Sequence, residues 1–208
     1  MGGNGLVGST LAKYASLQHD IHLTVNHDYS SHKVIPHTKI DLLYDEDTLF
    51  ELIKNWKPTV VVNTVALSSV DLCETNTKLA NQLHVETTKN IVNICKEFNS
   101  KLIHFSTDAV FDGKLDGKYS EKDEPNPINY YGKTRLEAEK IVLCNSNMNV
   151  VLRTAVIYGW HERSRFTNWI IPYLKEGKIV DPFTDQFNTP TLVDDLIKRT
   201  KGPCIKAL

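Results

Sequence analysis

With 208 residues, the chain can form one large domain, or one domain and a small lobe, around a substantial core. Its formal net charge is −1 and no block of like charge stands out, which argues against a nucleic-acid partner. No apolar run reaches the ~18 residues that a membrane span needs, and the first residues lack a signal-peptide pattern, so we expect no membrane segment.

Strand and helix patterns alternate along the chain. The predicted helices span residues 6–17, 47–56, 76–98 and 128–143. The predicted strands span residues 21–25, 59–63, 101–105 and 150–153, and residues 108–127 form a loop rich in Asp, Gly and Pro. Asp45 is a candidate N-cap of the second helix, which Pro58 ends. This alternation predicts an α/β fold, a doubly wound parallel sheet with helices on both faces.

Cysteine and histidine spacing gives no sign of a metal site. The four cysteines are far apart and form no CxxC pair, and the eight histidines include no HExxH arrangement. We therefore predict reduced thiols in a cytoplasmic protein, scattered core or surface histidines, and no metal ion.

A glycine-rich loop opens the first helix. Gly2, Gly5 and Gly8 have the spacing that lets a backbone turn tightly and approach a pyrophosphate, whose charge a helix N-terminus stabilises. Such a loop normally follows a strand, and no strand pattern precedes this one. We therefore expect the sheet to lack its first strand, which would leave ladder groups unpaired on both neighbours.

The residues after the second strand bear on cofactor choice. An acidic residue at the tip of that strand selects NAD through the ribose hydroxyls. Asn26 and His27 are not acidic and Lys33 is near, which favours NADP. Asp28 keeps NAD open, and an ordinary polar turn is a third reading.

Three residues could form a centre for carbonyl reduction. Thr107 follows a buried strand, at the edge where ligands bind in open α/β sheets. Tyr131 begins a helix, and Arg135 lies one turn later on the same face. Tyr131 could act as general acid, Thr107 could hydrogen-bond the carbonyl oxygen, and a cation near Tyr131 would stabilise the phenolate. The alternative is an aromatic residue at a helix start with a solvated charge.

The chain resembles the extended short-chain dehydrogenase/reductases, specifically the dTDP-4-dehydrorhamnose reductase family. The regulatory β subunit of methionine adenosyltransferase belongs to the same group. The motifs that carry the resemblance lie in residues 2–8, 62–66, 70–74, 105–113, 130–139, 152–155 and 185–191.

The resemblance implies a Rossmann domain over residues 1–155 that binds NADP(H) or NAD(H). It also implies a partial lobe over residues 156–208, joined by the loop 109–127, for a nucleotide-sugar substrate. The family reaction is reduction of the 4-keto group of dTDP-6-deoxy-L-lyxo-4-hexulose to dTDP-L-rhamnose.

Individual site residues follow from the motif match. The catalytic positions are Thr107, Tyr131 and Arg135. The cofactor positions are Gly2, Gly5, Leu6 and Val7 at the pyrophosphate, Asp41 and Leu42 at the adenine edge, Ala66 and Leu67 at the nicotinamide side, and again Tyr131 and Arg135.

Two features keep other functions open. Arg135 stands where the family usually has lysine, and a planar guanidinium does not replace a compact ammonium in detail. Both ends of the chain are expected to lack elements of the fold. A non-catalytic NADP-binding regulator of the methionine adenosyltransferase type and an inactive fragment are therefore the alternatives, and a homodimer is possible.

Overall fold

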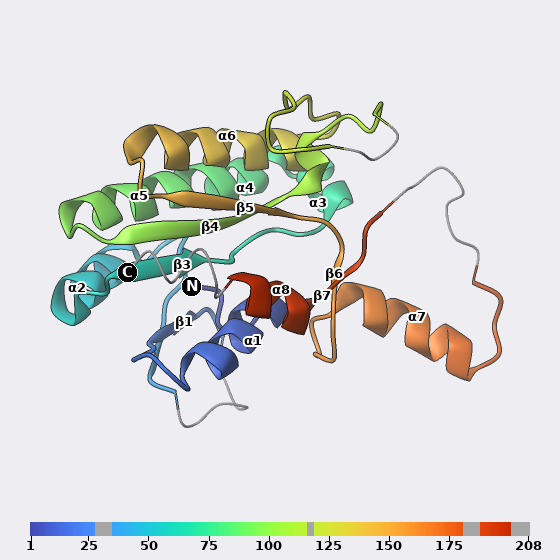
Figure 1. The fold of residues 1–208 in the computed structure, drawn as a ribbon, viewed down its shortest axis with the longest axis horizontal. Helices are drawn as coiled ribbons and strands as arrows, with labels where there is room; N and C mark the ends of the chain where they lie inside the picture. Colours follow the sequence, from blue (N-terminus) through green and yellow to red (C-terminus); the bar gives the residue numbers. More distant parts are fainter. Residues whose placement is uncertain (28–34, 116–118, 181–187, 201–208) are drawn as a thin grey trace.

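A computed structural model describes residues 1–27, 35–115, 119–180 and 188–200 of the chain, and Figure 1 shows their arrangement. The strands pair in three parallel ladders, β1–β2, β3–β4–β5 and β6–β7. Their bounds are β1 (Leu23–Val25), β2 (His37–Lys39), β3 (Val60–Asn63), β4 (Lys101–Thr107), β5 (Val150–Thr154), β6 (Ile157–Tyr158) and β7 (Thr191–Leu192). This parallel pairing confirms the predicted α/β class.

Helices connect the strands and cover both faces of the β3–β4–β5 ladder. The α-helices are α1 (Leu6–Ala15), α2 (Glu46–Trp56), α3 (Val70–Thr75), α4 (Thr77–Asn81), α5 (Thr87–Glu97), α6 (Tyr130–Asn145), α7 (Arg165–Lys175) and α8 (Val193–Thr200). Two short turns complete the set, the π-helical η1 (Gln82–Glu86) and the 3-10 turn η2 (Asp108–Val110). In Figure 1, α4, α5 and α6 lie on one face of the ladder, and α1 and α8 lie on the other.

Strand β4 is the centre of the core, since all seven of its residues are buried. Successive side chains of a strand point to opposite faces. Leu102 packs with Ile91 of α5, whereas Ile103 packs against Val7 of α1 and Leu196 of α8. Helices on both faces thus explain why β4 is buried throughout.

The glycine loop enters the sheet between β1 and β3. The amide of Gly3 donates to the carbonyl of Thr24 (3.0 Å), and the amide of Thr64 donates to the carbonyl of Met1 (3.3 Å). No strand pairing joins β1 to β3 in the described ranges, and a cavity of about 410 Å³ lies there, lined by residues of α1, β1 and β3. The missing strand pairing agrees with the sequence, but Met1 and Gly3 bond some of the backbone groups that were expected to be unpaired.

Most predicted elements are present with shifted ends, and some were missed. The helix predicted over residues 76–98 consists of α4, η1 and α5 in succession, and the strand predicted over 101–105 extends to Thr107. Sequence patterns did not reveal β2, α3, β6, α7, β7 or α8. Asp45 precedes α2 as predicted, but its carboxylate accepts from the amide of Asp41 (2.9 Å) and caps no amide of α2. The predicted N-cap position of Asp45 is therefore confirmed, whereas its side chain is taken by the tight turn before the helix.

Some predictions concern residues outside the described ranges. Asp28, Lys33 and residues 185–187 of the last motif are among them. Within the described ranges, no helix is long and apolar enough to cross a membrane.

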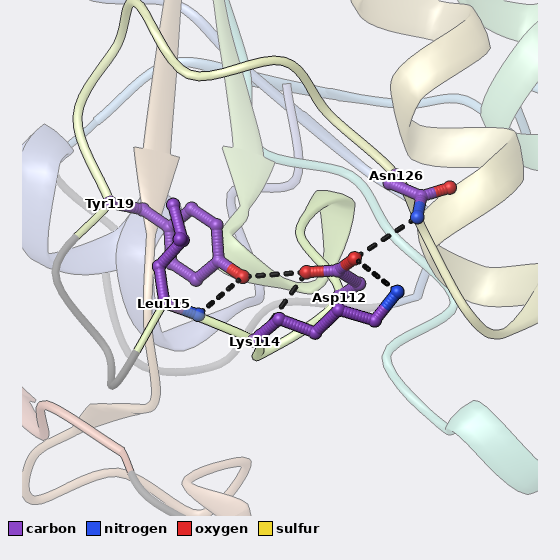
Figure 2. Close-up of polar contacts among 5 residues, drawn as sticks. All are labelled: Asp112, Lys114, Leu115, Tyr119 and Asn126. Carbon is purple, nitrogen blue, oxygen red and sulfur yellow. Dashed lines mark hydrogen bonds and ion pairs between the residues drawn. The ribbon is translucent and has the colours of Figure 1, made fainter.

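Asp112 organises the loop that follows η2 (Figure 2). Its carboxylate accepts hydrogen bonds from the Tyr119 hydroxyl (2.6 Å) and the Asn126 side-chain amide (3.0 Å). It also accepts from the backbone amide of Lys114 (3.2 Å) and pairs with the ammonium of that lysine (3.3 Å). These donors, with the Tyr119 hydroxyl first, hold the pKa of Asp112 well below its usual range.

An aromatic and ionic chain anchors this loop to the sheet. The Tyr119 ring stacks on Phe111 with centroids 4.3 Å apart, and the Arg153 guanidinium lies 5.0 Å from the Phe111 centroid. Arg153 in turn makes a bidentate contact with the buried carboxylate of Glu139 in α6, at 2.7 to 3.1 Å. The loop is therefore attached through β5 to the helix that begins with Tyr130 and Tyr131.

We predict that Gly132→Ala destabilises the start of α6. A Cβ at this position would lie 2.2 Å from the carbonyl oxygen of Ala109, a backbone atom that cannot move aside freely. We expect a loss of about 1–3 kcal/mol in the free energy of unfolding, measured in urea. Lys133→Ala at the exposed neighbouring position should stay within ~0.5 kcal/mol. Equal effects of the two changes would contradict the close packing of α6 on η2.

We predict that Asp112→Ala loosens the loop and leaves the sheet intact. Amide hydrogen exchange in residues 109–127 should accelerate roughly tenfold, because three donors lose their acceptor. Since folding lowers the pKa of Asp112, its stabilisation is complete above the ordinary aspartate pKa of ~3.9 and declines only below it. The ratio of the exchange rate in Asp112→Ala to that in wild type should therefore be the same at pH 8 and pH 5. Lys114→Gln, which removes only the exposed ammonium, should have little effect.

Candidate functional site

The candidate site lies at the carboxyl ends of β3 and β4. Parallel strands end at the same edge of a sheet, which is where ligands bind in open α/β folds. Thr107 ends β4, Ala66 and Leu67 follow β3, and α6 begins above this edge with Tyr131 in its first turn. The structure thus assembles one predicted group of site residues at one end of the ladder.

The glycine loop makes a tight turn into α1. The amide of Gly5 donates to the carbonyl of Gly2 (2.9 Å), and Gly5 is the N-cap of the helix. Gly2 has a φ of 80°, and a Cβ on Gly8 would lie 2.2 Å from the Gly2 carbonyl oxygen, so both positions require glycine. Leu6 and Val7 are the first helical residues, and amides at a helix start have no partner within the helix. Such amides can bind an anion.

Thr64 brings this loop to the end of β3. Its hydroxyl donates to the carbonyl of Met1 (2.8 Å), and a Cβ on Gly2 would lie 2.6 Å from the hydroxyl oxygen. Val65, Ala66 and Leu67 follow directly along the chain. The loop and the predicted nicotinamide side are therefore neighbours.

The predicted adenine-edge residues sit in a separate turn after β2. The Asp41 carboxylate accepts from the amide of Leu43 (3.0 Å), and Leu42 packs against the large core cluster. No hydrogen bond joins Asp41 or Leu42 to the glycine loop among the residues that the structure describes. Their assignment as cofactor residues therefore stays a prediction.

The Thr107 hydroxyl is already engaged. It donates to the Asp108 carboxylate (3.1 Å) and accepts from the amide of Ala109 (3.1 Å), which caps η2. Burial raises the pKa of Asp108, although the hydrogen bond from Thr107 opposes that rise. Rotation of the hydroxyl away from Asp108 would free it to donate to a substrate oxygen.

Tyr131 is held near Thr107 by the packing of α6 on η2. Asn129 caps α6 by accepting from the amide of Gly132 (2.7 Å), and Glu74 accepts from the amide of Tyr130 (2.6 Å). Gly132 lies against the carbonyl of Ala109, two residues after Thr107. The half-buried Tyr131 ring is thus fixed beside the end of β4.

Arg135 is a buried cation that bridges two strands. Only 2% of the residue is exposed, and its guanidinium donates to the carbonyl of Val65 (3.2 Å) and to that of Phe105. Burial lowers the pKa of Arg135, and the neighbouring Tyr131 and Glu139 oppose that change. The guanidinium therefore ties the segment after β3 to β4.

Sequence reasoning missed two buried histidines beside Arg135. The Nδ1 atom of His104 contacts the Asn63 side-chain amide (3.2 Å), and His84 bonds both Leu67 and Thr134. Burial, with a smaller effect of the Arg135 charge, lowers the pKa of His84 to about 3 and that of His104 well below its usual range. Both imidazoles are neutral. In the sequence, these two histidines are marked only by their positions in a predicted strand and a predicted helix. Such positions predict burial, and burial alone indicates no function.

The chain is similar to known proteins over most of its length. The family model described as RmlD substrate binding domain matches residues 1–202. A dTDP-4-dehydrorhamnose reductase of Aggregatibacter actinomycetemcomitans is 30% identical over 195 residues, which cover 94% of this chain and 63% of that protein. Methionine adenosyltransferase 2 subunit beta of Bos taurus is 40% identical over 121 residues, 58% of this chain and 36% of that subunit.

A solved structure is similar over nearly the whole chain. The crystal structure of a hypothetical dTDP-4-dehydrorhamnose reductase from Sulfolobus tokodaii superposes with a TM-score of 0.81 at 32% identity, covering 95% of this chain and 68% of that one. The chain therefore spans about two thirds or less of the length of these proteins. Because the family model covers almost every residue, the chain belongs to the family described as RmlD substrate binding domain.

Proposed function

We propose that the chain is the nucleotide-binding and catalytic part of an NAD(P)H-dependent reductase. Its substrate is a nucleotide-linked deoxysugar, whose 4-keto group is reduced. The first candidate is dTDP-4-dehydrorhamnose. The observation that carries the proposal is the assembly of Thr107, Tyr131 and Arg135 at the end of the ladder that also adjoins the glycine loop.

The glycine loop fits a dinucleotide pyrophosphate. Gly2 and Gly8 leave no room for side chains, and the start of α1 offers amides to an anion. When bound, NAD(P)H supplies the hydride for the reduction. Asn26 and His27 after β1 carry no carboxylate to select the ribose hydroxyls of NAD, so NADPH is the favoured form.

Each residue at the centre has a distinct proposed role. Tyr131 donates a proton from its hydroxyl to the carbonyl oxygen as the hydride reaches the carbonyl carbon, which converts the ketone to a secondary alcohol. The Thr107 hydroxyl donates a hydrogen bond to that oxygen. The buried charge of Arg135 favours the phenolate left on Tyr131.

The proposed domain division follows the same logic. Residues 1–155 contain the glycine loop and the ladders β1–β2 and β3–β4–β5, whereas residues 156–208 contain α7 and the small β6–β7 ladder. We assign the first range to the cofactor, and the second range with loop 109–127 to the sugar.

A regulatory subunit is the second candidate function. The likeness to methionine adenosyltransferase 2 subunit beta motivates it, and so does the guanidinium of Arg135, which is occupied by two carbonyl groups. A protein of that kind would bind the dinucleotide and associate with a synthetase without turning over a sugar.

We predict that Tyr131→Phe abolishes reduction and leaves cofactor affinity unchanged. Loss of the proton donor should lower kcat by about 10²- to 10⁴-fold, while the NADPH dissociation constant stays within about twofold. The assay is NADPH oxidation with dTDP-4-dehydrorhamnose, and Tyr130→Phe is the matched control that should keep its activity. Full activity of Tyr131→Phe would show a wrong proton donor. Absence of turnover in wild type with retained NADPH binding would favour the regulatory candidate.

A further inference from the structure

We propose that His84 is a positioning residue: its imidazole locks the segment that carries Ala66 and Leu67 onto the helix that carries Tyr131. The catalytic meaning of this lock rests on the proposed reductase function, because it concerns the alignment of the nicotinamide side with the proton donor. The lock itself is a matter of hydrogen bonds and can be tested without activity.

Both ring nitrogens of His84 are used, each toward a different part of the site. The backbone amide of Leu67 donates to Nε2 (2.9 Å), and Nδ1 contacts the Thr134 hydroxyl (2.8 Å). An amide can only donate, so Nε2 is the acceptor and the neutral ring carries its proton on Nδ1. Nδ1 therefore donates to Thr134, whose hydroxyl donates to the carbonyl of Tyr130 (3.1 Å) or Tyr131 (3.0 Å).

The ring also supports Tyr131 directly. The centroids of the two rings lie 5.6 Å apart at 76°, an edge-to-face contact. His84 is fully buried and its neighbours fix it at both nitrogens, whereas the Tyr131 ring is half-buried. The buried His84 ring thus supports one side of the half-buried Tyr131 ring.

The π-helical turn η1 places His84 where it can make these contacts. The amide of Thr87 donates to the carbonyl of Gln82, five residues earlier, and the Thr87 hydroxyl donates to the same carbonyl (3.0 Å). One such turn shifts the register of side chains between α4 and α5, and single π-turns are frequent at functional sites. Cys73 also holds this segment, since its thiol donates to the carbonyl of Leu67 (3.4 Å).

His104 shows what a histidine that only fills the core looks like here. It is as deeply buried as His84, yet its ring bonds only the side chain of Asn63, and its Nε2 has no hydrogen-bond partner, among the residues that the structure describes. His84, by contrast, bonds the backbone of one site segment and a side chain of the helix that forms the other. That bridging, and not burial, is the reason for assigning it a positioning role.

The test uses His84→Ala and His84→Gln, with Val92→Ala as the control. Val92 lies in α5, is 1% exposed and packs in the core away from Leu67, so its truncation destabilises the same layer without touching the lock. The first readout is the exchange rate of the Leu67 amide relative to amides of β4. The second readout is whether the substitution changes kcat, the KM for NADPH, or both.

We expect His84→Ala to speed Leu67 amide exchange about 10- to 100-fold relative to β4, because the amide loses its acceptor. It should also lower kcat about tenfold or more, with the KM for NADPH changed less than about twofold. His84→Gln, which keeps an acceptor and a donor, should recover part of both losses. Val92→Ala should leave the exchange rate of the Leu67 amide, relative to the amides of β4, unchanged.

Two results would overturn the proposal. One is an unchanged Leu67 exchange rate in His84→Ala. The other is a kcat for His84→Ala equal to that of Val92→Ala in an active enzyme. If Leu67 exchange accelerates as expected but wild type reduces no sugar, the lock stands and the reductase assignment fails.

Discussion

The buried guanidinium of Arg135 is the contact on which the geometry of the site depends. It donates to the carbonyl of Val65, just after β3, and to that of Phe105 within β4, so it fixes the spacing between the segment after β3 and the strand that ends in Thr107. Its charge, added to the cost of burial, keeps His84 and His104 neutral. A neutral His84 can accept a hydrogen bond from the Leu67 amide at Nε2 and donate one to Thr134 from Nδ1. The cation therefore fixes the backbone spacing, whereas burial, reinforced by its charge, keeps the histidines around Tyr131 neutral.

A second charge network ties the loop that follows η2 to the same helix. The carboxylate of Glu139 is nearly inaccessible and takes a bidentate contact from Arg153, which lies over the ring of Phe111. Removal of Arg153 would leave the buried carboxylate of Glu139 unpaired, which is costly. Arg135 and Glu139 lie one turn apart on α6, so this helix carries the contacts that organise both halves of the site.

Much of this arrangement follows from the sequence, for identifiable reasons. The alternating strand and helix patterns, the glycine spacing and the position of Thr107 after a buried strand depend on local rules, and the structure confirms the parallel ladders and helices on both faces. The short exposed strand β2 and the helix α7, which contains Pro172 and buries no residue, leave weak local signals. Arg135 was predicted as a site residue, but its bonds to two backbone carbonyls and the contacts of His84 with Leu67 and Thr134 could not be read in advance, because they join residues that are 17 to 70 positions apart.

Binding of NADPH to the chain, measured by isothermal titration calorimetry with Gly8→Ala as control, tests the central claim most directly. The account predicts saturable binding by wild type and a loss of binding in Gly8→Ala, where a Cβ would displace the carbonyl of Gly2. A parallel titration with NADH reports the cofactor preference. A wild-type sample that melts cooperatively but binds neither nucleotide would contradict the account, because the loop and the site would then be assembled without holding the hydride donor.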